Sequence, residues 1–287
     1  MASFGSPTAA LRIACVGNSI TRGDARQEPG EGTHMPHKYK THNRGNFPAE
    51  LATLLAGRAA VANFGHGGCS VLNTTRMGCQ NFDEWRYALA WKPTVVLLMA
   101  GTNDSKESLW NSHEFIRAYH RMALQLLALP SRPALLVMAP PPLIASKAPW
   151  RPEFLRSEVV PRIVSAVGSI QRRLRQSEHA DDACWPGSVH FLNLHDDAAY
   201  AACRGPAPAD DAGCSRLFVA DGVHTSVEGS RAIAGAVFAR LRNCSTARAA
   251  APKLRRRLGK QELLAILRRQ RREGEPGGGA PDAVRSR

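Results

Sequence analysis

The stretch Thr94-Val-Val-Leu-Leu-Met-Ala-Gly-Thr-Asn-Asp104 decides the fold of this chain. Its first seven residues are apolar or β-branched, which is typical of a strand that is buried on both faces of a parallel sheet. Gly101 ends the apolar run, and the polar side chains of Asn103 and Asp104 follow at once. This arrangement predicts an α/β protein that carries functional groups at the carboxyl end of its sheet.

The same alternation recurs along the chain. Short apolar runs predict strands at residues 11–16, 60–64, 94–100, 134–139 and 189–194, and helical patterns occupy residues 48–57, 82–90, 113–129, 158–176 and 227–241. Because short strands alternate with longer helices, we expect a parallel sheet covered on both faces, and hence three α/β/α layers. In such a sheet the ligand site lies beyond the carboxyl ends of the strands, where the winding direction reverses.

Three more polar motifs accompany the turn at 101–104. They are Gly17-Asn18-Ser19-Ile20-Thr21 after the first strand, Asn63-Phe64-Gly65-His66-Gly67-Gly68 at the end of the second, and Asp221-Gly222-Val223-His224 before the last helix. Each alone has an ordinary structural interpretation as a helix cap, a tight loop, a turn or a surface pair. Together they supply the nucleophile, oxyanion donors, base and orienting acid of a serine esterase.

The residue types fit these roles individually. Ser19 is expected in the turn from the first strand into a short helix, whose N–H groups stabilise developing negative charge. Asp221 and His224 are three residues apart, so both side chains can face one way. The carboxylate then fixes the imidazole tautomer, and the other ring nitrogen takes the Ser19 proton. The amide of Asn103 donates to an oxyanion without competing as a base.

These blocks resemble those of the SGNH, or GDSL-type, hydrolases over about residues 11–242. The four namesake residues would be Ser19, Gly68, Asn103 and His224, with Asp221 as the triad acid. The resemblance implies a five-stranded, flavodoxin-like parallel sheet, an oxyanion hole formed by Ser19 N–H, Gly68 N–H and the Asn103 amide, and no cofactor. Gly68 follows Asn63 by five residues, as in the family pattern.

The chain departs from the family pattern at Asn18, where the family usually has Asp. This residue is not the triad acid, so we expect altered local hydrogen bonding and retained activity. The chain has no Gly-x-Ser-x-Gly motif. That absence argues against the α/β-hydrolase fold, which shares the Ser, Asp, His order.

Three segments are similar to those of sialate O-acetylesterase-like and acetylxylan-esterase-like members, which deacetylate carbohydrates. They are Ala100-Gly-Thr-Asn-Asp-Ser-Lys, Leu127-Ala-Leu-Pro-Ser-Arg-Pro and Ala139-Pro-Pro-Pro. The resemblance implies an O-acetylated glycan or small-molecule ester as substrate. His66 and Trp110 are candidate substrate contacts, although a tryptophan is more often simply packed. A lipid or phospholipid esterase, a thioesterase, and a non-catalytic binding module that uses the basic tail stay open as alternatives.

Composition bears on the class of protein and on its cellular compartment. The chain has 287 residues, of which 44% are hydrophobic and 22% charged, as in soluble globular proteins. No apolar run is long enough to span a bilayer, and residues 1–11 lack the features of a signal peptide, so we expect a cytoplasmic location. Seven cysteines leave a secreted form open, because Cys69/Cys79 and Cys203/Cys214 lie in loop-like sequence suited to local disulfides. Cys15 is expected to be a buried free thiol.

Metal binding and nucleic-acid binding are not expected. There is no CxxC or Cys/His spacing typical of zinc, and the histidines other than His224 are interpreted as surface or loop residues. The net charge is +14, of which residues 248–287 carry +8 through twelve Lys or Arg and four Asp or Glu. We therefore divide the chain into a hydrolase domain at 1–247 and a basic tail at 248–287, partly helical and partly disordered. The tail suits an anionic surface or is a solvated extension, and it has no aromatic interleaving for base stacking.

Overall fold

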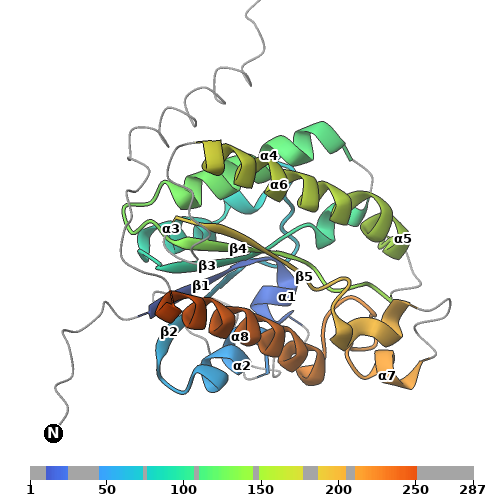
Figure 1. Cartoon of the computed structure of the whole chain (residues 1–287). Coiled ribbons are helices and arrows are strands. Elements are labelled where there is room, and N and C mark those ends of the chain that lie inside the picture. Colours follow the sequence, from blue (N-terminus) through green and yellow to red (C-terminus); the bar gives the residue numbers. More distant parts are fainter. Residues whose placement is uncertain are drawn as a thin grey trace, which may run out of the picture.

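The fold is organised around one parallel sheet. The computed structural model describes residues 11–24, 45–73, 76–106, 110–144, 149–176, 187–204 and 211–250. Its strands are β1 (Leu11–Gly17), β2 (Ala59–Gly65), β3 (Val95–Met99), β4 (Ala134–Ala139) and β5 (Val189–Asn193). They lie in the order β2-β1-β3-β4-β5, and every neighbouring pair is parallel. The predicted five-stranded, flavodoxin-like sheet is confirmed (Figure 1).

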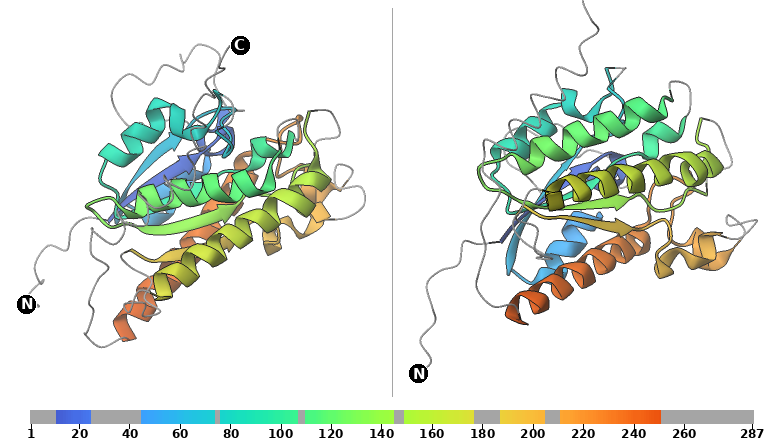
Figure 2. Two further views of the ribbon diagram at one scale, coloured as in Figure 1. Left: turned by 90° about the horizontal axis from the view of Figure 1, so that it is seen from above. Right: turned by 45° about the horizontal axis from the view of Figure 1, so that its top comes forward.

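Helices cover both faces of the sheet. The longer ones are α2 (Phe47–Leu55), α3 (Asp83–Ala90), α4 (Ser112–Leu127), α6 (Val160–Gln176) and α8 (Val227–Ala250). The short ones are α1 (Ser19–Arg22), α5 (Pro152–Phe154), α7 (Ala212–Ser215), the π-helix η4 (Leu155–Val159) and the 3₁₀ helices η2 (Cys79–Asn81), η3 (Thr102–Lys106) and η5 (Ala198–Arg204). Figure 2 shows α4 and α6 side by side on one face, with α8 on the opposite face. These are the three layers predicted from the sequence.

Side chains along each buried strand point alternately to the two faces of the sheet, where they form two hydrophobic cores. In β3, Val96 and Leu98 belong to the cluster under α3, α4 and α6, whereas Val95, Leu97 and Met99 belong to the cluster under α2 and α8. All five side chains are at most 1% exposed. Successive side chains of a strand point to opposite faces, so an uninterrupted apolar run fits a strand that is covered on both sides.

Two helices differ in length from the prediction. The helical segment expected at 158–176 begins at Pro152 and passes through the π-helix η4 before α6. Pro161 has no N–H, so it cannot form the regular bond to the carbonyl of Ser157 in η4. Helix α8 continues to Ala250, across the expected domain boundary at 247. The rest of the basic tail, and the loop at 25–44, lie outside the described residues.

No described helix is both long enough and apolar enough to span a bilayer.

Candidate active site

The predicted site lies where the sheet reverses its winding. Strand β1 lies between β2 and β3 in the parallel sheet, so the turns that follow these three strands lie next to each other at the carboxyl end of the sheet. The backbone ties them together, since the N–H of His66 donates to the carbonyl of Gly17 at 2.9 Å. This position is the one at which doubly wound sheets bind their ligands.

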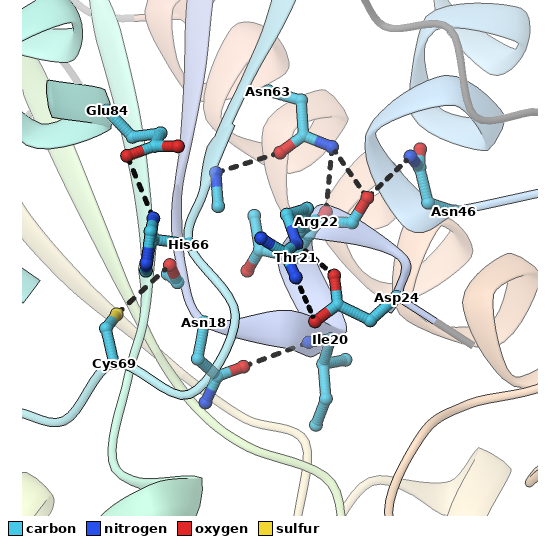
Figure 3. A network of polar contacts seen from close by, with 12 residues as sticks. Asn18, Ile20, Thr21, Arg22, Asp24, Asn46, Asn63, His66, Cys69 and Glu84 are labelled. Carbon is cyan, nitrogen blue, oxygen red and sulfur yellow. Dashed lines mark hydrogen bonds and ion pairs between the residues drawn. The ribbon is translucent and has the colours of Figure 1, made fainter. Parts of the chain in front are cut away.

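Ser19 is the first residue of α1, directly after β1. The side chain of Asn18 caps the helix by accepting a hydrogen bond from Ile20 N at 3.1 Å (Figure 3). Asn18 is completely buried, and its Nδ2 has no partner among the described residues. The acceptor function of the capping position is therefore retained where the family usually has Asp. Ser19 itself is 6% exposed, so the packed turn holds it with little freedom.

Asn63, at the end of β2, connects residues 65–72, which we call the glycine loop, to α1. Its Oδ1 accepts from Gly65 N at 3.0 Å, and its Nδ2 donates to the carbonyl of Thr21 at 2.9 Å (Figure 3). The last carbonyls of a helix have no partner within the helix, and Asn63 satisfies one of them. The loop that carries the predicted oxyanion donor is thus fixed to the helix that carries Ser19.

Gly68 has a φ of +76°, which favours glycine. Within the described part of the chain its N–H donates no hydrogen bond, so it can serve an incoming oxygen. The neighbouring Gly67 packs against Arg22 and Asp24, and a Cβ at residue 67 would overlap both side chains. The Arg22 guanidinium donates two hydrogen bonds to the Asp24 carboxylate. The two opposite charges therefore compensate each other beside the loop.

Asn103 reaches the glycine loop from η3. Its Nδ2 donates to the carbonyl of Cys69 at 2.8 Å, so one of its two amide hydrogens holds the loop. The second hydrogen remains for an oxyanion. The next residue, Asp104, accepts from Val71 N and Leu72 N, each at 3.0 Å. The position of Asp104 in the sequence predicts no functional role, because an aspartate in a turn usually bonds its own backbone.

Asp221 and His224 form the predicted pair. His224 Nδ1 lies 2.6 Å from Asp221 Oδ2, and Asp221 Oδ1 accepts from the N–H groups of Val223 and His224 at 2.8 and 2.9 Å. Partial burial favours the neutral acid, but the hydrogen bonds from the His224 ring and the two N–H groups outweigh it, so the pKa of Asp221 is lowered. The ionised carboxylate therefore places the Nδ1 proton of His224 and leaves Nε2 as the base.

Ser19 and His224 are not hydrogen-bonded to each other in this structure. Within the described residues, neither Ser19 Oγ nor His224 Nε2 has a hydrogen-bond partner. Hydrogen bonds of this kind are often long or absent in ligand-free enzymes and tighten when substrate is bound. The proton transfer from Ser19 to His224 stays a prediction.

His66 and Trp110 have different surroundings. The His66 ring stacks on Phe82 with centroids 3.6 Å apart, and its Nδ1 lies 3.0 Å from Glu84 Oε2 (Figure 3). Its side chain is 25% exposed, so Nε2 can meet a ligand above the glycine loop. Trp110 packs on Phe115 and Phe154, with centroid separations of 4.9 and 5.4 Å. Contact of either residue with substrate stays a prediction.

The expected disulfides and buried thiol are confirmed, whereas the expected position of one histidine is wrong. Cys69–Cys79 and Cys203–Cys214 are disulfides, and Cys15 is a free, buried thiol whose pKa is raised by burial. One histidine contradicts the expectation of surface or loop positions, since His120 is 7% exposed inside α4, whereas His195 is 4% exposed but lies in the turn after β5. His120 lies on the apolar face of α4, where it contacts the carbonyl of Ala166 and the hydroxyl of Ser169, and these contacts replace the water that it loses. The described residues contain no cluster of three or more potential metal ligands.

The sheet and the four turns define an α/β hydrolytic enzyme with a serine at the first strand end. Residues 15–232 match the GDSL-like lipase/acylhydrolase family. This match covers more than half of the chain, so the protein belongs to that family of carboxylic ester hydrolases. The predicted family and fold are therefore confirmed.

Relatives in sequence and structure agree with this assignment. An acetylxylan esterase from Xylanibacter ruminicola is 32% identical over 172 residues, which are 53% of this chain and 33% of that protein. The match thus spans a third of that relative's length. A lipase/acylhydrolase from Enterococcus faecalis has a TM-score of 0.54 and 16% identity over 81% of this chain and 96% of its own. A family two carbohydrate esterase from Clostridium thermocellum, in complex with cellohexaose, has a TM-score of 0.51 and 17% identity over 84% of this chain and 66% of its own. The 16% and 17% identities of the two solved structures support the fold alone.

Proposed function

We propose that this protein removes acetyl groups from O-acetylated carbohydrates through an acyl-enzyme intermediate on Ser19. The observation that carries the proposal is the Asp221–His224 pair, joined by a 2.6 Å hydrogen bond in the turn before α8, in a domain that presents Ser19 after β1 and Gly68 after β2. The choice of an acetylated glycan is supported by the 32% identity to an acetylxylan esterase.

The reaction proceeds in two steps. His224 Nε2 takes the Ser19 proton as Ser19 Oγ bonds to the acetyl carbon, and the carbonyl electrons move to oxygen. The N–H groups of Ser19 and Gly68 and the amide of Asn103 donate to this oxyanion. The intermediate collapses, and the sugar hydroxyl leaves with the proton from His224. Water, deprotonated by His224, then attacks the acetyl-serine and releases acetate and free Ser19.

A panel of esters tests this function. The wild-type chain should release acetate from acetylated xylan and from acetylated sugars, and should hydrolyse p-nitrophenyl acetate faster than the octanoate ester. Ser19→Ala should abolish all of these activities while thermal unfolding stays unchanged. Ser165→Ala, at an exposed position of α6, is the matched control and should retain full activity.

Each contrary outcome has a defined meaning. Activity that survives Ser19→Ala contradicts the mechanism. A preference for octanoyl esters or for thioesters moves the substrate to the lipid or thioester class and leaves the mechanism in place. No hydrolysis at all, together with a salt-sensitive affinity for an anionic partner that is lost on deletion of residues 248–287, favours the binding-module alternative.

We also propose that the protein matures in an oxidising compartment, in place of the cytoplasmic location expected from its first residues. The two disulfides support this proposal, because such bonds persist mainly where thiols are not kept reduced. Non-reducing peptide mapping of protein from its native source should recover the linked Cys69–Cys79 and Cys203–Cys214 peptides. Recovery of these four cysteines as free thiols would contradict it.

A further inference from the structure

Helix η3 holds the glycine loop through two adjacent side chains. Asn103 donates to the carbonyl of Cys69, and the two carboxylate oxygens of Asp104 accept from Val71 N and Leu72 N. Three backbone groups within the four residues that follow the predicted oxyanion donor Gly68 are therefore fixed by one short turn. Such rigidity matters because an oxyanion donor contributes most when it needs no reorganisation during the reaction.

The loop is also anchored on its other side. Cys69 is bonded to Cys79, while Ser70 N donates to the carbonyl of Met77 and Cys79 N donates to the carbonyl of Ser70, both at 2.9 Å. These contacts close the loop but do not involve the N–H groups of residues 71 and 72. Asp104 is their acceptor, so its contribution is separate from that of the disulfide.

The hydrogen bonds that Asp104 accepts from the loop depend on whether its carboxyl group is ionised. The residue is 6% exposed, and burial raises the pKa of its carboxyl to about 6 in spite of the bonds from Leu72 and Val71. Among the described residues, the ionisable groups that interact electrostatically with it are Lys106 on η3 and Tyr119 on α4. Lys106 Nζ lies 4.2 Å from the Trp150 ring centroid, and Tyr119 is completely buried with a raised pKa. Neither replaces the carboxylate as the acceptor of the two loop N–H groups.

We propose that Asp104 is a positioning residue of the esterase, whose ionised carboxylate holds residues 71 and 72 so that the N–H of Gly68 stays aimed at the oxyanion. The proposal rests on the proposed function of Ser19. Protonation places a hydrogen on one carboxyl oxygen, which then competes with a loop N–H and loosens the segment. A residue that only stabilised the fold would change unfolding without changing the chemical step or its pH profile.

The test compares Asp104→Asn with Asp211→Asn in the full chain. Asp211 is a matched control, because its Oδ1 also accepts from two backbone N–H groups, those of Gly213 and Cys214, beside the other disulfide. With p-nitrophenyl acetate, Asp104→Asn should lower kcat by about 10-fold or more and change KM by less than about 3-fold. Asp211→Asn should leave kcat unchanged. The acid limb of log kcat against pH should be steeper in the wild type than in Asp104→Asn, which lacks one ionisation.

A second measurement uses the wild type alone and applies even if Asp104→Asn does not fold. The amide NMR signals of Val71 and Leu72 should shift together with a midpoint near the carboxyl pKa of about 6. Unchanged kcat and an unchanged acid limb in Asp104→Asn, or amide signals that do not titrate, overturn the proposal. An inactive wild type overturns the proposed function, whereas the amide titration still reports on the hydrogen bonds.

Discussion

Replacing both cysteines of one disulfide with alanine should separate stability from activity in this protein. The linked cysteines are 10 residues apart in Cys69–Cys79 and 11 apart in Cys203–Cys214. Loop-closure entropy depends on this separation, so each bond is expected to contribute a nearly equal stabilisation of about 3 kcal/mol. For a domain of this size, the loss of either bond corresponds to a decrease in Tm of roughly 6–12 °C.

The two variants should differ in activity because the bonds lie in different places. Cys69 adjoins Gly68 and receives the hydrogen bond from Asn103, whereas Cys203 and Cys214 join η5 to α7. We expect Cys69→Ala/Cys79→Ala to lose about 10- to 100-fold in kcat, which is less than the roughly 100- to 1,000-fold cost of deleting an oxyanion donor. Cys203→Ala/Cys214→Ala should keep kcat within about 2-fold, because neither cysteine adjoins Gly68 or accepts a hydrogen bond from Asn103.

The assay is steady-state hydrolysis of p-nitrophenyl acetate at a temperature where both variants are fully folded, with Tm measured by calorimetry. Treatment of the wild type with a thiol reductant should reproduce the loss of kcat, and Cys203→Ala/Cys214→Ala should respond to the reductant as the wild type does. Equal losses of kcat in both variants would refute the reasoning. An unchanged kcat in Cys69→Ala/Cys79→Ala, with the expected loss of Tm, would refute it as well.

Further predictions concern backbone geometry, the orientation of the base and proton linkage. Gly68→Ala should lower both kcat and Tm, since φ is +76° and an added Cβ would lie 3.1 Å from the Cε of Met77. The control is Gly57→Ala, which has the same φ and open space around it. It should lose only the conformational cost of about 1–2 kcal/mol in stability and keep kcat. Asp221→Asn should lower kcat by about 10,000-fold, as expected when the base loses its orienting carboxylate. The lowered pKa of Asp221 means that the unfolded state binds more protons, so its stabilisation is present above an unfolded pKa of about 3.9 and is lost as pH falls through the folded value. Asp104 has the opposite sign, so between about pH 4 and 6 the wild-type free energy of unfolding should decrease with rising pH relative to Asp104→Asn, as measured by urea titration.

The sheet could be predicted from sequence because its strands are buried on both faces. An uninterrupted apolar run such as Val95–Met99 has one interpretation when Gly101 follows it and helical patterns stand on either side. The start of the helix before α6 could not be predicted, because Pro152 and Pro161 both suit a first helical turn. The structure continues through Pro161 only by adopting the π-helix η4 before it.

The site was predictable where a residue's role depends on its place at a strand end. Ser19, Gly68 and Asn103 each follow a strand of one parallel sheet, so the topology alone brings their segments to one edge. The role of Asp104 depends on hydrogen bonds to residues 71 and 72, which are more than thirty positions earlier in the chain. The burial of His120 likewise depends on contacts with α6. Local sequence carries no information on such long-range partners.

The glycine loop shows how a flexible sequence can hold a donor in place. A run with glycine at 65, 67 and 68 loses much conformational entropy when it is ordered, so it needs partners on both sides. Asn63 binds the start of the loop to α1, whereas Asn103 and Asp104 bind its end to η3. The span between these anchors carries the N–H of Gly68, which donates no hydrogen bond within the described residues. The bonds on both sides restrain that N–H before substrate arrives, so the site can stabilise an oxyanion without first ordering the loop.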